Sequence, residues 1–215
     1  MSNIVHDYIE EYIDKTQKKN EDFFENLRNY AESNHIYIVK RQVEQLLITL
    51  VSALKPKKVL ELGTAIGYSA LLFHEFSGGA RVTTIERDSE VLKMAKENIK
   101  LRGAEDHINC IFGDASEVLQ NLNEKFDLIF IDAAKGQYKS YFDECLKNLN
   151  PGGVIITDDV LYMGMTASDE LAIKKHITIT RRLREFLDYI CNDERFSTTI
   201  LPVGDGVAVT YVKEE

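Results

Sequence analysis

The segment that decides the fold is Lys58-Val59-Leu60-Glu61-Leu62-Gly63-Thr64-Ala65-Ile66-Gly67-Tyr68-Ser69. It predicts a buried strand, a tight turn and the start of a helix, because its apolar run ends at an acid and a glycine and a helix-like run follows the second glycine. Gly63 and Gly67 allow the backbone to approach a ligand without an intervening Cβ. The Gly-Lys-Ser/Thr ending of a Walker loop is missing, and Ala65 takes the middle small position of a dinucleotide fingerprint. The segment therefore favours a nucleotide-like ligand without fixing which one.

From Lys57 onward, short apolar runs alternate with amphipathic segments. Strands are expected over 58–62, 81–86, 108–112, 126–131 and 153–157, and helices over 67–77, 88–102, 115–122 and 137–148. Such alternation predicts an α/β fold, with a mostly parallel sheet covered by helices on both faces. A turn is expected over 149–153 and a long helix from 168 to 191. The segments 197–201 and 206–212 alternate like a hairpin, which would give the sheet an antiparallel edge.

Three further helices are expected before the sheet, over 4–13, 21–33 and 41–54. The first two carry apolar stripes at helical spacing. They either cover the core or form a lid or a dimer surface, and the pattern leaves these alternatives open. We expect a single domain, with an N-terminal helical cap over 1–54 and an α/β core over 55–215.

Composition limits the class of protein. The 215 residues suffice for one sizeable core. The formal net charge of −9 argues against indiscriminate binding of nucleic acid. The three cysteines are scattered singly, which indicates reduced thiols and shows no zinc spacing.

Targeting signals are not apparent in the sequence. No apolar run approaches the roughly 18 residues needed to span a bilayer, so no membrane partner is expected. The first seven residues are acidic and amphipathic, whereas a signal peptide begins basic and then turns apolar. We therefore expect a cytoplasmic protein.

Two acids follow expected strands near the glycine turn. Glu86 closes the second strand, where a carboxylate can accept both hydroxyls of a ribose; the alternative is a solvated acid that begins the next helix. Asp114 follows the third strand and would either face an adenine amino group or cap the next helix.

Three more acids end the fourth and fifth strands. Asp132 follows the fourth, and Asp158 and Asp159 follow the fifth. Clustered carboxylates without Cys or His are suited to Mg²⁺, Mn²⁺ or Ca²⁺ rather than zinc. The alternative, loop capping, is disfavoured because adjacent acids repel one another unless something positive lies between them. We therefore predict a divalent-metal site at Asp132, Asp158 and Asp159.

Together, five motifs resemble the metal-dependent O-methyltransferases of class I, which use S-adenosylmethionine (SAM). The family includes catechol and caffeoyl-CoA O-methyltransferases. The motifs are Glu61–Ser69, Ile85-Glu86-Arg87, Gly113-Asp114-Ala115, Phe130–Lys135 and Thr157–Leu161. The resemblance implies a Rossmann-like fold of seven strands in the order 3-2-1-4-5-7-6, and a homodimer. It implies a SAM site formed by Val39, Glu61, Ser69, Glu86, Ala115 and Asp132.

The resemblance also implies a catalytic lysine, Lys135, three residues after Asp132. Near a metal the pKa of its ammonium should fall, so that it can serve as a base; the alternative is a plain surface lysine. The family typically has Asn at the position of Asp159. The extra charge should tighten cation binding but leave less Lewis acidity for the substrate, so the choice of metal stays open.

A basic stretch interrupts the acidic chain between Leu171 and Arg184. It contains Lys174, Lys175, His176, Arg181, Arg182 and Arg184, with no acid in the interval. It is either a solvated helix face or a surface that contacts the phosphates of an RNA or of a CoA thioester.

The motifs Phe130–Tyr138, Arg181-Arg182-Leu183 and Ile200–Gly206 resemble a bacterial branch of the family that includes the tRNA 5-hydroxyuridine methyltransferase. This resemblance implies methylation of 5-hydroxyuridine at the anticodon wobble position, giving 5-methoxyuridine. A single-stranded anticodon loop can place such a base in a pocket. A small catechol-like or CoA-linked phenol is the alternative substrate.

Overall fold

The computed structural model describes residues 4–214, which fall into two compact units. The N-terminal unit spans 11–115, and the C-terminal unit combines residues 4–10 with 116–214. Residues 1–3, on which part of the signal-peptide expectation depends, lie outside the described residues. Within residues 4–214, no helix combines the length and apolar character that a membrane crossing requires.

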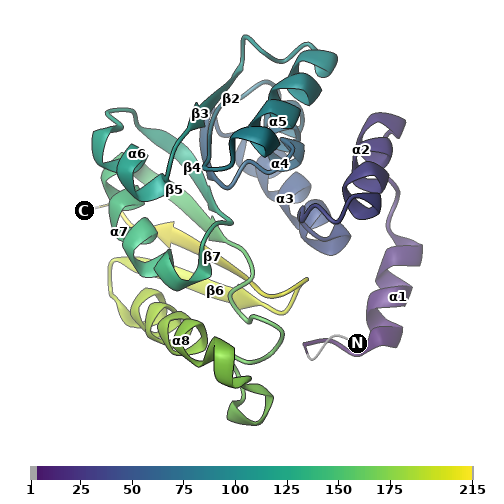
Figure 1. The fold of residues 1–215 in the computed structure, drawn as a ribbon. Helices are drawn as coiled ribbons and strands as arrows, with labels where there is room; N and C mark the ends of the chain where they lie inside the picture. The colour runs from purple at the N-terminus through teal and green to yellow at the C-terminus, as the bar shows by residue number, and fades with distance from the viewer. Residues whose placement is uncertain (1–3, 215) are drawn as a thin grey trace. The chain divides into compact units, whose positions relative to one another are not determined.

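The N-terminal unit is built on three parallel strands. After α1 (Asp7–Thr16), which has no buried residue, its elements are α2 (Asp22–Ser33), α3 (Arg41–Leu54), β1 (Lys58–Leu62), α4 (Tyr68–Phe76), β2 (Arg81–Glu86), α5 (Ser89–Arg102) and β3 (Ile108–Phe112). Strand β2 pairs with β1 on one side and with β3 on the other, and the β1 register places Glu61 opposite Thr84. Helices α4 and α5 pack on β2 and β3 (Figure 1). The carboxyl ends of β1 and β2 therefore lie at one edge of this part of the sheet.

Local sequence explains where these helices begin and end. The Asp88 carboxylate accepts hydrogen bonds from the backbone N–H groups of Glu90 and Val91 and so caps the start of α5. Gly103, with φ 72°, ends the same helix in the left-handed conformation. Helix α2 buries Phe24, Leu27, Arg28 and Ala31. It is therefore part of the packed N-terminal unit, whereas α1 has no buried side chain.

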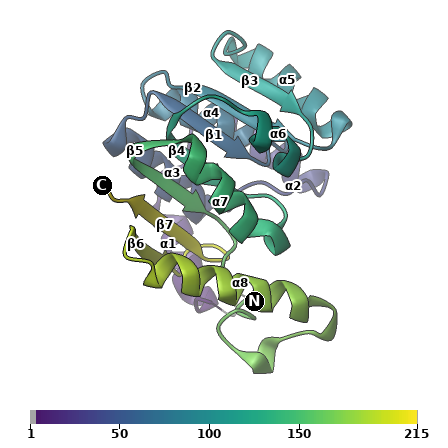
Figure 2. The same ribbon diagram turned by 90° about the vertical axis from the view of Figure 1, so that its left-hand side faces the viewer.

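The C-terminal unit adds four strands and the helices around them. Its elements are α6 (Ala115–Asn121), β4 (Phe126–Ile131), the 3₁₀ turn η1 (Lys135–Gln137), α7 (Tyr138–Asn148), β5 (Leu149–Thr157), the 3₁₀ turns η2 (Asp169–Leu171) and η3 (Lys174–His176), α8 (Ile177–Asn192), β6 (Phe196–Leu201) and β7 (Val207–Val212). Strand β5 is parallel to β4 and antiparallel to β7, which in turn is antiparallel to β6. Helices α7 and α8 lie side by side, with α7 along β4 and α8 along β6 (Figure 2). Edge-to-face contacts of Phe142 with Phe186 and Phe196 fill the space between them.

The strand order is β3-β2-β1-β4-β5-β7-β6. The α/β fold class with a seven-stranded, mostly parallel sheet and an antiparallel edge hairpin is therefore confirmed. All three cysteines are free thiols, as expected.

Three sequence-based boundaries are wrong. The helix expected over 4–13 runs instead from Asp7 to Thr16. The expected turn over 149–153 lies within β5, because the pairing jumps from Phe126–Leu149 to Leu128–Val154 and the extra residues form a bulge. The helix expected from 168 to 191 begins only at Ile177. Residues 168–176 before it contain two 3₁₀ turns of three residues each, and the Ser168 side chain caps the first by accepting a hydrogen bond from the backbone N–H of Glu170.

Candidate active site

The glycine loop, residues 63–67, connects β1 to α4. Its backbone has positive φ angles at Gly63 (102°), Ala65 (45°) and Gly67 (81°). Side chains with a Cβ rarely adopt such angles, and a Cβ on Gly67 would lie 3.4 Å from the Cβ of Ala95. The two glycines selected from the sequence are therefore required by the turn itself.

Glu86, at the end of β2, holds this loop. Its Oε2 accepts a hydrogen bond from Ala65 N at 3.1 Å, while its Oε1 accepts from Arg87 N at 2.9 Å and Asp88 N at 3.0 Å. An ionised carboxylate offers about four acceptor sites, so these three bonds leave capacity for a ligand hydroxyl. Glu86 is thus fixed to the loop and is not merely a solvated acid at the start of α5.

Glu61 and two threonines form a buried hydrogen-bond chain within the N-terminal unit. All three side chains are fully buried. The Thr84 hydroxyl donates to Glu61 Oε2 at 2.5 Å, and the Thr64 and Thr84 hydroxyl oxygens are 2.6 Å apart. Because Thr84 has one proton and gives it to the carboxylate, Thr64 must be the donor in the second bond. These hydrogen bonds therefore join Thr64, in the glycine loop, to Thr84 of β2 and Glu61 of β1.

The remaining residues predicted to bind a cofactor in this unit are nearly inaccessible or follow β3. Val39 is 4%, Ser69 7% and Ala115 8% exposed. The carbonyl of Val39 accepts a hydrogen bond from Arg28 Nη2 at 3.0 Å, which fixes the connector before α3. Gly113 N donates to Glu86 O at 3.0 Å, so the backbone that leads into Asp114 lies beside the end of β2.

The acid cluster, defined as Asp132, Asp158 and Asp159, lies in the C-terminal unit at the ends of β4 and β5. Asp158 N donates to Ile131 O at 3.0 Å, which holds the two strand ends together. Asp158 is 3% exposed, and its Oδ1 accepts a hydrogen bond from Asp159 N at 2.7 Å. Asp159 has a left-handed backbone, with φ 58°. Adjacent parallel strands therefore bring the three predicted acids to one edge.

Burial and mutual repulsion make these carboxyls hard to ionise. Burial, followed by the charge of Asp159, raises the pKa of Asp132 to about 7, although Lys135 acts in the opposite direction. Burial and the charges of Asp132 and Asp159 also raise the pKa of Asp158 well above its ordinary value. Burial and mutual repulsion therefore oppose the simultaneous ionisation of the three carboxyls.

Lys135 lies against this cluster, with its Nζ 2.7 Å from Asp159 Oδ2. Burial lowers the pKa of Lys135, but the charge of Asp159, the hydrogen bond to it and the charges of Asp132 and Asp158 outweigh burial and raise the pKa. The expected fall in the pKa of Lys135 concerns a chain with a bound metal and stays a prediction; without a cation the pKa is raised. Its ammonium is the counter-ion of the acids, which hold its proton in place.

The donor set has the chemistry of a hard-cation site, since three carboxylates and no sulfur or imidazole favour Mg²⁺, Mn²⁺ or Ca²⁺. Among residues 4–214, however, no three His, Cys, Asp or Glu side chains are arranged around a common point that could hold a metal. Asp159 is instead engaged by Lys135. The three acids match a divalent cation in charge and ligand type, but the structure does not arrange them around one point.

The basic stretch divides into two parts. Arg184 is a structural residue, because its guanidinium donates to Thr166 O at 2.8 Å and Met165 O at 3.1 Å and pairs with Asp169 at 2.6 Å. The exposed part, here named the basic segment, consists of Lys174, Lys175, Arg181 and Arg182. Arg182 Nη1 also donates to Gly136 O at 3.1 Å, which places α8 beside the turn that carries Lys135.

Sequence reasoning did not single out several polar residues with defined places here. Thr64 and Thr84 could have been noticed as hydroxyls in a buried strand–turn unit, and Tyr138 as a tyrosine three residues after Lys135. The Tyr162 hydroxyl lies 2.7 Å from His176 Nδ1, a pair joined across 14 residues that no sequence spacing indicates.

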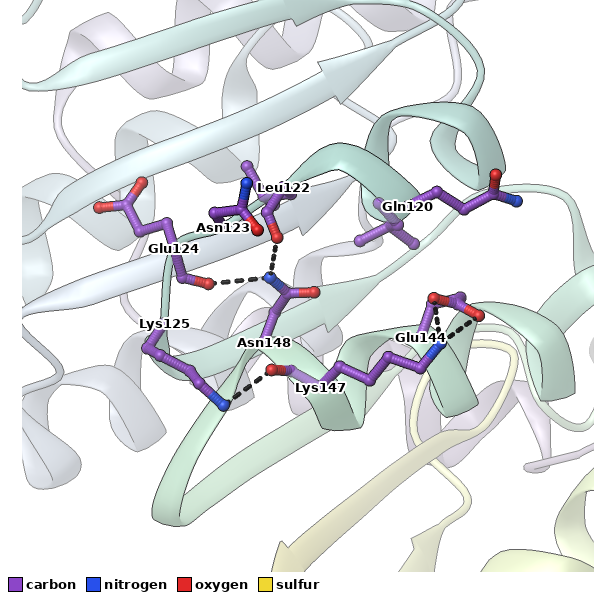
Figure 3. A pocket seen from close by; sticks show the side chains of 9 residues that line it. Gln120, Leu122, Asn123, Glu124, Lys125, Glu144, Lys147 and Asn148 are labelled. Atoms are coloured by element: carbon purple, nitrogen blue, oxygen red, sulfur yellow. Dashed lines mark hydrogen bonds and ion pairs between the residues drawn. The ribbon is translucent and has the colours of Figure 1, made fainter.

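A separate cavity of about 430 Å³ is lined by the segment that leads into β4 and by the end of α7 (Figure 3). Asn148 Nδ2 donates to the carbonyls of Leu122 and Glu124, and Lys125 Nζ donates to the carbonyl of Lys147. These hydrogen bonds hold the two segments together.

Comparison with known proteins gives a consistent result. The sequence profile of the family described as O-methyltransferase matches residues 14–213. A caffeoyl-CoA O-methyltransferase of Stellaria longipes is 30% identical over 174 residues, covering 76% of this chain and 71% of that protein.

Solved structures agree. An SAH-bound methyltransferase of Podospora anserina superposes with a TM-score of 0.86 at 27% identity, covering 97% of this chain and 95% of its own. An O-methyltransferase of Bacillus cereus in complex with SAH gives a TM-score of 0.83 at 28% identity, covering 96% and 97%. The profile match over nearly the whole chain and the shared fold show that this chain belongs to the O-methyltransferase family and is a SAM-dependent O-methyltransferase.

Proposed function

We propose that this enzyme requires a divalent cation, most simply Mg²⁺, and that it methylates 5-hydroxyuridine at the wobble position of the tRNA anticodon. The observation that carries the proposal is the acid cluster at the ends of β4 and β5 with Lys135 against it. A 5-hydroxyuracil presents a hydroxyl next to a carbonyl oxygen, and such an oxygen pair suits a carboxylate-held cation as a catechol does.

In the proposed mechanism, Asp132, Asp158 and Asp159 would hold the cation, which would supply a Lewis acid for the acceptor hydroxyl. The loop glycines Gly63 and Gly67, with Glu61 and Glu86, bind SAM. Methyl transfer forms the bond from the acceptor oxygen to the methyl carbon while the sulfur–carbon bond breaks.

Lys135 is the proposed base for the hydroxyl proton. Its Nζ can accept that proton only after losing its own, which the charge of Asp159 opposes. If Asp159 bound a cation in place of Lys135, it would complete the ligand set. Its negative charge would then no longer keep Lys135 protonated.

The basic segment supports a phosphate-bearing substrate. Its four exposed cations stand on a chain of net charge −9, and Arg182 contacts the turn that carries Lys135. Cationic side chains position a polyanion without reading its sequence. A tRNA stem would be held by such contacts while its anticodon base reaches the acids.

The direct test is nucleoside mass spectrometry of tRNA from a strain that lacks this gene. We expect 5-methoxyuridine to disappear and 5-hydroxyuridine to accumulate, and purified enzyme with SAM and Mg²⁺ to restore the modification in vitro. Persistence of 5-methoxyuridine, with no second methyltransferase supplying it, would exclude the tRNA substrate. Full activity in excess EDTA would show that the reaction does not require a divalent cation.

A small catechol-like or CoA-linked phenol is the second candidate, because relatives that are 30% and 31% identical are named caffeoyl-CoA O-methyltransferases. The double variant Lys175→Glu, Arg181→Glu distinguishes the two candidate substrates. Both residues are exposed and lie far from the acid cluster in the sequence. If tRNA is the substrate, the double variant loses tRNA methylation and keeps any turnover of free catechol. Arg182 is left intact because it holds the turn of Lys135.

The expected homodimer remains a proposal, supported by Tyr8, Ile9 and Tyr12 of α1, which expose 70%, 36% and 70% of their surface. Sedimentation of the wild type beside a Tyr8→Ser, Tyr12→Ser variant tests it. A wild type that sediments as a monomer would contradict the dimer.

A further inference from the structure

Tyr162 and His176 form a pair that joins the loop after β5 to the basic segment. The Tyr162 hydroxyl lies 2.7 Å from His176 Nδ1, and the two rings meet edge to face with their centroids 5.3 Å apart. Both side chains are half-buried. His176 is the last residue of η3, which also contains Lys174 and Lys175. The pair therefore connects these two lysines to the loop that begins at the acid cluster.

The Tyr162 side of the pair is fixed by the surrounding backbone. Leu161 N donates to Asp205 O at 2.9 Å, and Met163 N donates to Asp205 Oδ1 at 2.7 Å. Between these two bonds the chain is left-handed, with φ 45° at Tyr162 and 56° at Met163. Residues with a Cβ keep such angles only where neighbouring contacts impose them, and they are frequent at functional sites. Tyr162 thus presents its hydroxyl from a backbone that is held in place.

The His176 side of the pair carries two cations without partners. Within residues 173–178, His176 is half-buried while every other residue is exposed. Its ring is therefore the contact that seats this short exposed segment. Neither Lys174 nor Lys175 has an ion-pair partner among residues 4–214. Both ammonium groups are consequently available to an anion.

Binding of a polyanion orders the cationic side chains that contact it, and this loss of freedom weakens binding less when the cations are already in place. We propose that the Tyr162–His176 pair places Lys174 and Lys175 for contact with the phosphates of an RNA, so that Tyr162 and His176 are positioning residues for substrate binding. The proposal rests on the tRNA substrate proposed above and does not require a bound cation. The lysines would supply phosphate contacts, which set affinity and register without reading sequence.

The alternative is that the pair only stabilises the fold. In that case the loss of the pair and the loss of the lysines act independently, and their effects on RNA affinity multiply. If the pair places the lysines, they contribute little to affinity once the pair is broken. The coupling between the two changes therefore distinguishes positioning from plain stabilisation.

The experiment measures binding of the full chain to a fluorescein-labelled RNA hairpin with the sequence of an anticodon stem-loop, by fluorescence anisotropy in EDTA and without SAM. Tyr162→Phe removes the hydrogen bond and keeps the ring, and we expect it to bind about fivefold more weakly than the wild type. His176→Phe removes the same bond and should have the same effect. The matched control is Tyr189→Phe in α8, which removes a hydroxyl that accepts from Arg195 at 3.1 Å and should leave the affinity unchanged.

The double variant Lys174→Ala, Lys175→Ala completes the cycle. With the pair intact, we expect this change to weaken RNA binding about tenfold, because two phosphate contacts are lost. In the Tyr162→Phe background the same change should weaken binding by no more than about twofold. Circular dichroism spectra that match the wild type check that each variant is folded.

The outcomes separate this proposal from the proposed substrate. An equal loss on removing the lysines in both backgrounds, or Tyr162→Phe binding like the wild type, overturns the positioning role and leaves the tRNA substrate standing. Weak binding by Tyr162→Phe beside normal binding by His176→Phe also overturns it, because both changes break one bond. A wild type that does not bind the hairpin overturns both proposals.

Discussion

The buried ion pair Arg28–Glu44 gives a prediction that does not depend on the substrate. Arg28 Nη2 lies 2.6 Å from Glu44 Oε2, and the two residues are 5% and 0% exposed. Glu44 Oε1 also accepts from Asn20 Nδ2 at 3.0 Å, while Arg28 donates to the carbonyl of Val39. The pair thus joins α2 and α3 to the connector that carries a predicted cofactor residue.

Glu44→Ala would leave the Arg28 guanidinium buried without its counter-ion. Breaking a buried pair from one side costs about 3–5 kcal/mol, a large share of the roughly 5–15 kcal/mol that stabilises a typical domain. The exposed pair Glu11–Lys15, with side chains 69% and 78% exposed, provides the matched control. Glu11→Ala should cost no more than about 0.5 kcal/mol.

Urea unfolding followed by circular dichroism measures both free energies. A second arm replaces both partners, with Arg28→Met and Glu44→Leu, and should recover most of the loss because no buried charge remains. SAH affinity, measured by calorimetry, should fall in Glu44→Ala because Arg28, which donates to the Val39 carbonyl, loses the carboxylate that positions its guanidinium. A loss below about 1 kcal/mol in Glu44→Ala would refute the reasoning, since it would mean that the Arg28 charge is not confined in the interior.

Four further results are expected. Because the pKa of Asp132 in the folded chain is raised to about 7, the folded chain binds this proton more tightly than the unfolded chain, and without cation the free energy of unfolding should fall as pH rises from about 4 to about 7. Asp132→Asn should flatten this dependence of the free energy of unfolding on pH, as measured by urea unfolding. An unchanged dependence in the variant would contradict the raised pKa. Asp159→Asn removes one carboxylate and the ion pair with Lys135, so Mn²⁺ affinity should fall roughly tenfold; equal affinity would remove Asp159 from the ligand set. Lys135→Met should lower the methyl-transfer rate at neutral pH at least about 100-fold with SAH affinity unchanged. An unaltered rate would show that Lys135 is not the base. Thr84→Val breaks both bonds of the Glu61–Thr64 chain and should cost about 1–3 kcal/mol, with Thr84→Ser, which keeps the hydroxyl, as the control; equal thermal midpoints for the two would contradict the chain.

Periodicity in the sequence was sufficient for most of the fold. Strands β1 to β4 begin and end where expected, because buried parallel strands are continuous apolar runs bounded by glycine and acid. The failures occur where tertiary contacts override local pattern. The helix expected from 168 begins at 177, and Arg184 from the middle of α8 holds the preceding segment at Met165, Thr166 and Asp169. The expected turn at 149–153 became a bulge because β4 pairs on both sides of it.

By itself the sequence determined the strand and helix alternation, the glycine turn and the placement of acids at strand ends, since each of these follows from neighbours within a few positions. The tertiary structure alone decided which polar groups meet. It placed Lys135 on Asp159, directed Arg184 to backbone carbonyls and joined Tyr162 to His176. Such partners are tens of residues apart, and their charge states depend on burial, which only the packed chain creates.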